Sequence, residues 1–126
     1  MEQYCDQLLD EVGLTNQRNQ RANNLPYGMQ RRLEIARALA TTPKLLLLDE
    51  PAAGMNEEES DQLSDFIRSI RNDRNITVII IDHHMDVIMS ICDQISVLNF
   101  GTLLAEGEPK NIQNNQEVIS AYLGVD

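Results

Sequence analysis

Two short apolar runs dominate the hydrophobic pattern of the chain. Residues 44–49 (KLLLLD) and 76–81 (ITVIII) lack the apolar–polar alternation of a strand with one exposed face. Such runs are typical of strands buried on both faces, as in a parallel sheet covered by helices. Between them, apolar residues over 63–70 recur at three- and four-residue steps and predict an amphipathic helix. Strand, helix and strand make a βαβ unit, so we predict that the two strands pair in parallel.

Shorter predicted elements surround this unit. A weak apolar stripe predicts a helix over residues 2–12, which Gly13 ends, and the polar residues 15–24 predict a loop. A clearer helix is predicted over residues 30–40. Asn56 and Glu59 form a capping box at the start of the helix inside the βαβ unit, and this explains the acidic cluster at 57–59 better than a metal site does. The C-terminal part predicts a helix over 85–91, a strand over 94–98, a hairpin partner over 102–105, and helices over about 109–113 and 115–123.

Composition narrows the class of protein. A length of 126 residues corresponds to one small domain or part of a larger one. The net charge of −10 argues against nonspecific nucleic-acid binding, which needs basic residues at the phosphates. Cys5 and Cys92 are far apart and form no CxxC, so we expect free thiols in a reducing compartment. We see no signal-peptide pattern and no apolar run near the ~18 residues of a membrane span, so we expect a cytoplasmic location.

Polar residues follow both buried strands directly. Asp49 and Glu50 end the first strand, and His83 follows the second. Parallel strands bring their carboxyl ends to one edge of a sheet, so we expect these three side chains to converge there. An Asp can hold Mg²⁺, a Glu can position or deprotonate a water, and a His can hydrogen-bond a phosphate oxygen. The alternative is an exposed strand end with two solvated acids.

Two further candidate sites are weaker. A zinc site could use Asp82, His83, His84 and Asp86, but adjacent histidines on an extended segment point to opposite sides, so we do not expect them to share a metal. Gly28 stands just before the helix predicted over 30–40. A glycine there allows close approach to the backbone, and a helix N-terminus attracts anions, although an ordinary loop-to-helix entry would look the same.

Three segments follow one another along the chain: LPYGMQRRLEIARAL, KLLLLDEPAAGMN and TVIIIDHHMDVIM. In this order they closely resemble the C-terminal half of an ABC-transporter ATPase. LPYGMQ stands where the ABC signature stands, LLLLDEP looks like the Walker B strand with its catalytic Glu, and AAGMN looks like the D-loop. The EPAAG sequence with Asn56, and the ending GEPKNIQNNQEVISAYLG, are most similar to ATPase subunits of branched-chain amino-acid uptake systems. The resemblance covers nearly the whole chain from about Val12.

The resemblance implies an α/β fold, namely the C-terminal part of a P-loop NTPase domain with a parallel sheet flanked by helices. Residues of about 1–43 would end a helical signature subdomain, and about 44–126 would belong to the catalytic core. It implies ATP and Mg²⁺ as cofactors, a second ATPase subunit in a head-to-tail dimer, and membrane permease subunits. The domain would then lie peripherally on the inner face of the cell membrane.

The resemblance also implies a role for each matched residue. Asp49 would serve Mg²⁺, Glu50 would be the general base, and His83, in the place of the switch histidine, would contact the γ-phosphate. The remaining positions would face the partner subunit or its ATP: Leu25, Pro26, Tyr27, Gly28 and Met29 from the signature, and Ala53, Gly54 and Asn56 from the D-loop.

The chain departs from the family pattern in two ways. Pro26 replaces the usual signature Ser and has neither a hydroxyl nor an N–H, and Met29 stands at the Gln position with Gln30 next. More important, no GxxxxGK[ST] stretch is present, so the backbone cradle for phosphates is missing. By resemblance, the P-loop strand would lie between the strands at 76–82 and 94–98, and the chain would lack the centre of its sheet.

Three alternatives to an importer ATPase follow. The chain could be an inactive truncated fragment or interaction module, a split ATPase with a coiled coil, or the ATPase of a related transporter such as a lipid exporter. The split ATPase is disfavoured because no sustained heptad pattern is present.

Overall fold

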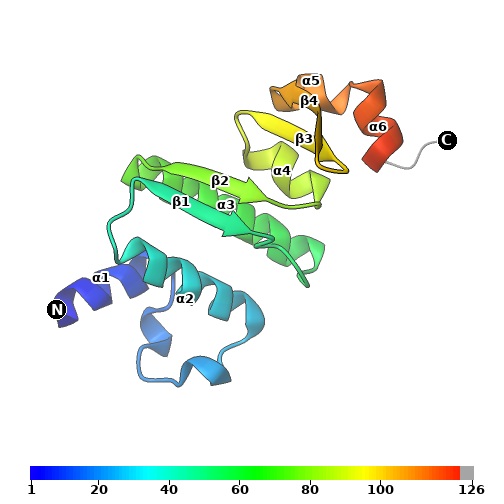
Figure 1. Ribbon diagram of the computed structural model, residues 1–126. Coiled ribbons are helices and arrows are strands. Elements are labelled where there is room, and N and C mark those ends of the chain that lie inside the picture. Colours follow the sequence, from blue (N-terminus) through cyan, green and yellow to red (C-terminus); the bar gives the residue numbers. More distant parts are fainter. Residues whose placement is uncertain (123–126) are drawn as a thin grey trace. The chain divides into compact units, whose positions relative to one another are not determined.

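The structure is a computed structural model that describes residues 1–122, and the chain divides into two compact units between Ile81 and Asp82. The first unit contains, in order, α1 (Glu2–Glu11), the short 3-10 turns η1 (Thr15–Gln17) and η2 (Ala22–Asn24), α2 (Tyr27–Leu39), β1 (Leu45–Asp49), α3 (Glu57–Arg74) and β2 (Thr77–Ile81) (Figure 1). The second contains α4 (Met85–Ile91), β3 (Ile95–Asn99), β4 (Thr102–Gly107), α5 (Pro109–Gln113) and α6 (Gln116–Tyr122).

The first unit is built on the predicted βαβ arrangement. β1 and β2 pair in parallel, with Leu45 opposite Thr77 and Asp49 opposite Ile81. α3 connects the two strands and lies along one face of the pair (Figure 1). The predicted parallel pairing is therefore confirmed, and both strands deliver their carboxyl ends to the same edge of the sheet.

The prediction that these strands are buried on both faces is wrong. Leu46 is 4 % exposed, whereas its neighbour Leu47 is 67 % exposed. Ile79 and Ile81, on the same face as Leu47, are 50 % and 64 % exposed. The helices of the first unit pack against only one face of this two-stranded sheet, so successive side chains along each strand alternate between the core and the other face although nearly all of them are apolar.

The ends of α3 are fixed by local chemistry that the sequence predicted. The backbone N–H of Glu59 donates to Asn56 Oδ1 at 2.9 Å, and the backbone N–H of Asn56 donates to Glu59 Oε2 at 3.0 Å. This is the expected capping box. At the other end, Asn75 takes a left-handed conformation (φ 51°), a common way to end a helix.

An ion pair ties the end of α3 to α1. Arg74 donates two hydrogen bonds to Glu11, from Nε to Oε1 at 2.5 Å and from Nη2 to Oε2 at 2.6 Å. Hydrogen bonding to the Arg74 guanidinium lowers the pKa of Glu11 below its ordinary value of 4.5. The bidentate geometry fixes the register between these two distant helices.

α2 begins earlier than the pattern predicted, at Tyr27 rather than residue 30. Pro26 is its N-cap residue, and the first backbone bond of the helix runs from Gln30 N to Pro26 O at 3.0 Å. A proline at a helix start loses nothing by lacking an N–H, because the first amides of a helix have no intrahelical acceptor. Gly28 therefore lies inside the first helical turn.

The second unit is a hairpin packed with short helices. β3 and β4 pair antiparallel, from Ile95 opposite Gly107 to Asn99 opposite Thr102, which confirms the predicted hairpin. The turn between them places Phe100 and Gly101 at φ 49° and 77°. The last residue of the helix predicted over 115–123 lies outside the described residues. Over residues 1–122, no helix combines the length and apolar character needed to cross a membrane.

Candidate functional site

Two adjacent carboxylates at the carboxyl end of β1 have different backbone settings. Asp49 is the last strand residue and is exposed. Glu50 is also exposed, but its backbone is left-handed (φ 44°), and its N–H donates to Ile81 O at 2.7 Å. A left-handed non-glycine residue is strained by about 1–2 kcal/mol, and such strain concentrates at functional sites. The two neighbouring carboxylates therefore stand on backbone of different conformation.

The segment after Glu50 is a compact turn that leads into α3. The N–H of Ala53 donates to Glu50 O and that of Met55 donates to Ala52 O, each at 3.1 Å. Ala52 is fully buried, so the turn is anchored in the core. Gly54 has φ 78°, a conformation that a residue with a side chain rarely adopts.

The structure brings this turn next to the start of α2. A Cβ atom on Gly54 would lie 3.8 Å from Cε1 of the Tyr27 ring. Arg31, one turn along α2, donates to the Tyr27 hydroxyl from Nε at 3.0 Å and from Nη2 at 2.6 Å. Residues 25–29 and 53–56 are separate motifs in the sequence. In the folded chain they form one surface of the first unit.

The amino end of α2 leaves backbone amides available. The amides of Tyr27, Gly28 and Met29 precede the first intrahelical bond, and a Cβ built on Gly28 would meet no atom within 4 Å. The chain's own packing therefore does not require a glycine at this position. Leu25 is buried, and the side-chain amide of Gln30 donates to its carbonyl oxygen at 2.9 Å. Sequence reasoning gave Gln30 no role, and only the folded helix start shows that it braces Leu25.

His83 belongs to the second unit, so its predicted convergence with Asp49 and Glu50 stays a prediction. Its local setting is well defined. Asp82 Oδ1 accepts hydrogen bonds from His83 N at 2.8 Å, His84 N at 3.0 Å and His84 Nδ1 at 2.5 Å. The rings of His83 and His84 have centroids 4.4 Å apart. The argument that adjacent histidines point to opposite sides is therefore wrong here, because residues 82–84 bend around the Asp82 carboxylate instead of extending.

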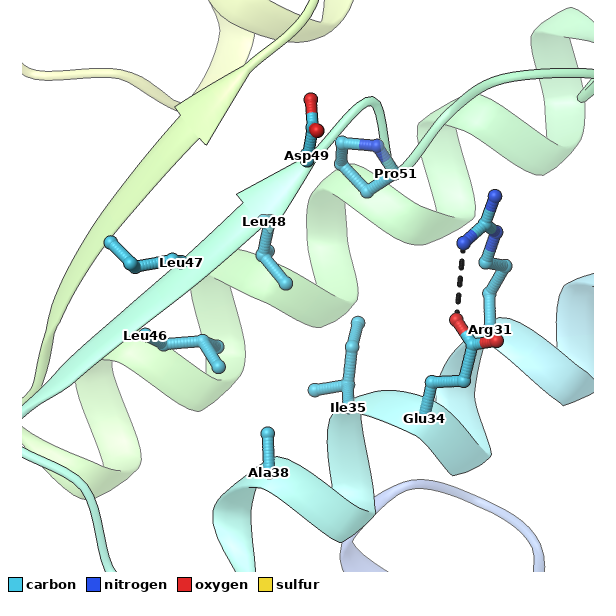
Figure 2. A pocket seen from close by; sticks show the side chains of 9 residues that line it. All are labelled: Arg31, Glu34, Ile35, Ala38, Leu46, Leu47, Leu48, Asp49 and Pro51. Carbon is cyan, nitrogen blue, oxygen red and sulfur yellow. Dashed lines mark hydrogen bonds and ion pairs between the residues drawn. The ribbon is translucent and has the colours of Figure 1, made fainter.

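A pocket of about 240 Å³ lies between α2 and β1. Figure 2 shows Leu46 and Leu48 facing Ile35 and Ala38 of α2 across it, with Asp49 at its end. The guanidinium at its rim, from Arg31, is paired with Glu34 at 3.1 Å. A mostly apolar lining and a paired cation are poorly suited to a triphosphate, so the pocket is no substitute for a P-loop.

Comparison with known proteins identifies the family. The family model described as "ABC transporter" matches residues 1–53, and that described as "Branched-chain amino acid ATP-binding cassette transporter" matches residues 102–126. The chain is 50 % identical over 122 residues to the high-affinity branched-chain amino acid transport ATP-binding protein BraF of Pseudomonas aeruginosa, covering 97 % of this chain and 48 % of BraF. The chain belongs to the ABC-transporter ATPase family.

Further relatives agree with this family and its fold. The corresponding protein LivG of Escherichia coli is 51 % identical over 116 residues, covering 92 % of this chain and 46 % of LivG. The crystal structure of the ADP conformation of MJ1267, an ATP-binding cassette of an ABC transporter, superposes with a TM-score of 0.87 at 28 % identity, covering 98 % of this chain and 50 % of that one. These matches confirm the predicted resemblance and fold class. This ABC ATPase chain spans about half the length of the curated relatives it matches.

Proposed function

We propose that this chain is the C-terminal half of an ATP-hydrolysing subunit that powers an ABC importer for branched-chain amino acids. The observation that carries the proposal is the pair Asp49 and Glu50 at the end of β1, one on the strand and the other on a strained turn. Adjacent carboxylates with different backbone settings suit two different tasks. Asp49 holds Mg²⁺, and Glu50 positions and deprotonates the attacking water.

The neighbouring motifs supply the rest of the site. His83 contacts the γ-phosphate through its imidazole. The amides at the start of α2, from Tyr27 to Met29, face the ATP of a second ATPase subunit, and the dipole of that helix favours negative charge. The closeness of Gly54 to Tyr27 supports a common surface for the signature and the D-loop, which the partner subunit would cover. The free energy of ATP hydrolysis would be transmitted to permease subunits in the membrane.

On this proposal, the groups that bind and hydrolyse ATP are shared between this chain and the other half of the domain. No GxxxxGK[ST] stretch occurs in the 126 residues, so the phosphate cradle must come from the other half of the domain. The exposed apolar face of the β1–β2 sheet supports the same division, since a sheet in a complete α/β domain is covered on both faces. On this proposal, residues of about 1–43 end the helical signature subdomain and the remainder belongs to the catalytic core.

The decisive experiment uses a completed domain, in which the chain is joined to the P-loop half of a relative such as LivG. Glu50→Gln should keep ATP binding and lower turnover at least about 100-fold, the range expected for a lost general base. Glu58→Gln, at an exposed acid in the first turn of α3, is the matched control and should leave turnover unchanged. Unchanged turnover in Glu50→Gln would show that Glu50 is not the base.

The absence of the P-loop motif favours a second candidate for the 126 residues by themselves, an interaction module without ATPase activity. We expect the isolated chain neither to bind ATP tightly nor to hydrolyse it. Turnover by the purified chain that Glu50→Gln abolishes would exclude this candidate.

A further inference from the structure

Asp82, His83 and His84 gather three metal-ligating side chains at the start of α4. One ligand atom from each lies within 4.8 Å of the other two. His83 and His84 are the only histidines in the sequence. Two imidazoles and one carboxylate form a donor set that suits zinc and other first-row transition metals much better than Mg²⁺.

The backbone already holds this cluster close to the geometry of a metal site. Asp82 Oδ1 accepts both following amides, which bends the chain and places the two imidazoles on the same side, with ring centroids 4.4 Å apart. Two ligands of one zinc ion lie roughly 3.4–4.2 Å apart, because zinc bonds are about 2.0–2.2 Å long. Shifts of about 1 Å in the positions of the exposed His83 ring and the partly buried His84 ring would therefore suffice to seat an ion.

We propose that Asp82, His83 and His84 bind a divalent transition-metal ion of the Zn²⁺ type. The competing account treats the cluster as a helix start alone, in which Asp82 serves the amides before α4. That account explains the bonds from His83 N and His84 N but needs neither imidazole. The bond from His84 Nδ1 to Asp82 Oδ1, at 2.5 Å, holds a ring nitrogen beside the carboxylate, and these two atoms would have to separate by about 1 Å to share an ion.

Metal binding needs no nucleotide, but it would affect the proposed function. On that proposed function, His83 contacts the γ-phosphate of ATP. A metal bound by the same imidazole would withdraw it from that contact, so occupancy would inhibit hydrolysis. The binding test below uses no nucleotide, so its failure and a failure of the ATPase proposal are distinguishable.

The experiment titrates Zn²⁺ into the full 126-residue chain against a chromophoric chelator. Cys5→Ser and Cys92→Ser are included throughout, because neither cysteine forms a disulfide and both would compete for zinc. We expect one Zn²⁺ per chain. His83→Asn and His84→Asn should each weaken binding more than about tenfold, since losing even an outer-shell partner of a ligand typically costs about 10–100-fold.

Two controls separate a folded site from a chance pair of histidines. Glu117→Gln, at an exposed acid in the first turn of α6, should leave the affinity unchanged. Binding should also disappear when urea unfolds the chain. The proposal would be overturned if the chain bound Zn²⁺ as tightly in urea as in its folded state, or if His84→Asn bound Zn²⁺ as tightly as the chain with His84 in place. His84→Gln, which keeps a hydrogen-bonding side chain beside Asp82, replaces His84→Asn if the latter loses its helical circular dichroism, and it too must bind zinc more weakly.

Discussion

Replacing Leu47 by alanine tests whether the exposed face of the β1–β2 sheet is covered in the complete domain. Leu47 is 67 % exposed, while Leu46, the adjacent residue on the same strand, is 4 % exposed. The two leucines are chemically identical and share one strand, so any difference between their alanine variants reports burial alone. Leu46→Ala is the matched control.

The exposures set the expected magnitudes. Fully burying a leucine stabilises a protein by about 1.5–3 kcal/mol, so the one third of Leu47 that is covered accounts for less than about 1 kcal/mol. Leu46→Ala also opens a cavity and should cost about 2–5 kcal/mol. In the 126-residue chain, the two variants should therefore differ by at least about 1 kcal/mol. In a completed domain, Leu47→Ala should become about as costly as Leu46→Ala.

The assay is urea unfolding, followed by far-ultraviolet circular dichroism, on both versions of the protein. With a slope of about 1–3 kcal/mol per molar urea, the midpoints of the two variants should differ by at least about 0.3–1 M. Measurements at several protein concentrations detect self-association that would cover the face. If Leu47→Ala lowers the free energy of unfolding only slightly in the completed domain, the inference that the other half covers this face is refuted.

Other predictions concern backbone and charge. Gly28→Ala should leave stability unchanged or raise it by up to about 1 kcal/mol, because its Cβ meets open space on a helix. Gly54→Ala should lose about 1–2 kcal/mol at φ 78°, and equal shifts in the urea midpoint of these two variants would contradict the structure. Asn56→Ala removes half of the capping box and should cost about 1 kcal/mol, so an unchanged midpoint would mean that the box does not form in solution. Glu11 has a lowered pKa because of its bond to Arg74, so its stabilisation is present above pH 4.5 and is lost as the pH falls through the lowered pKa. The difference in urea midpoint between the native chain and Glu11→Gln should therefore shrink as the pH falls through this range. A difference that stays constant with pH would show that the Glu11–Arg74 pair does not stabilise the fold.

Local patterns predicted the element types and their order well. The capping box at Asn56 and Glu59 and the hairpin over 94–105 rest on residues close in sequence, and both are present. The parallel pairing of β1 and β2 follows from the order strand, helix, strand, and it is present too. α2 begins three residues earlier than the apolar periodicity predicts, with Pro26 at its N-cap, a place that suits a residue without an N–H. Rules based on residues close in sequence therefore predicted well the features that such residues determine.

The candidate site was predicted less completely. The order of motifs identified Asp49, Glu50 and His83 and the family to which the chain belongs. It could not reveal that Glu50 is left-handed, because that conformation is imposed by the bond from its N–H to Ile81 O on the neighbouring strand. Nor could it reveal the contact of Tyr27 with Gly54, which are far apart in sequence and adjacent only after folding.

By itself, the sequence determined which segments become strands and helices, and which residues stand at the end of β1. Tertiary structure decided which apolar side chains are buried. Leu46 and Leu47 are the same residue type on the same strand. Leu46 is in the core and Leu47 faces solvent, because the helices of the first unit pack on a single face of the sheet. It also decided that His83 and His84 share a side, since the Asp82 carboxylate bends the backbone that an extended strand would have kept straight.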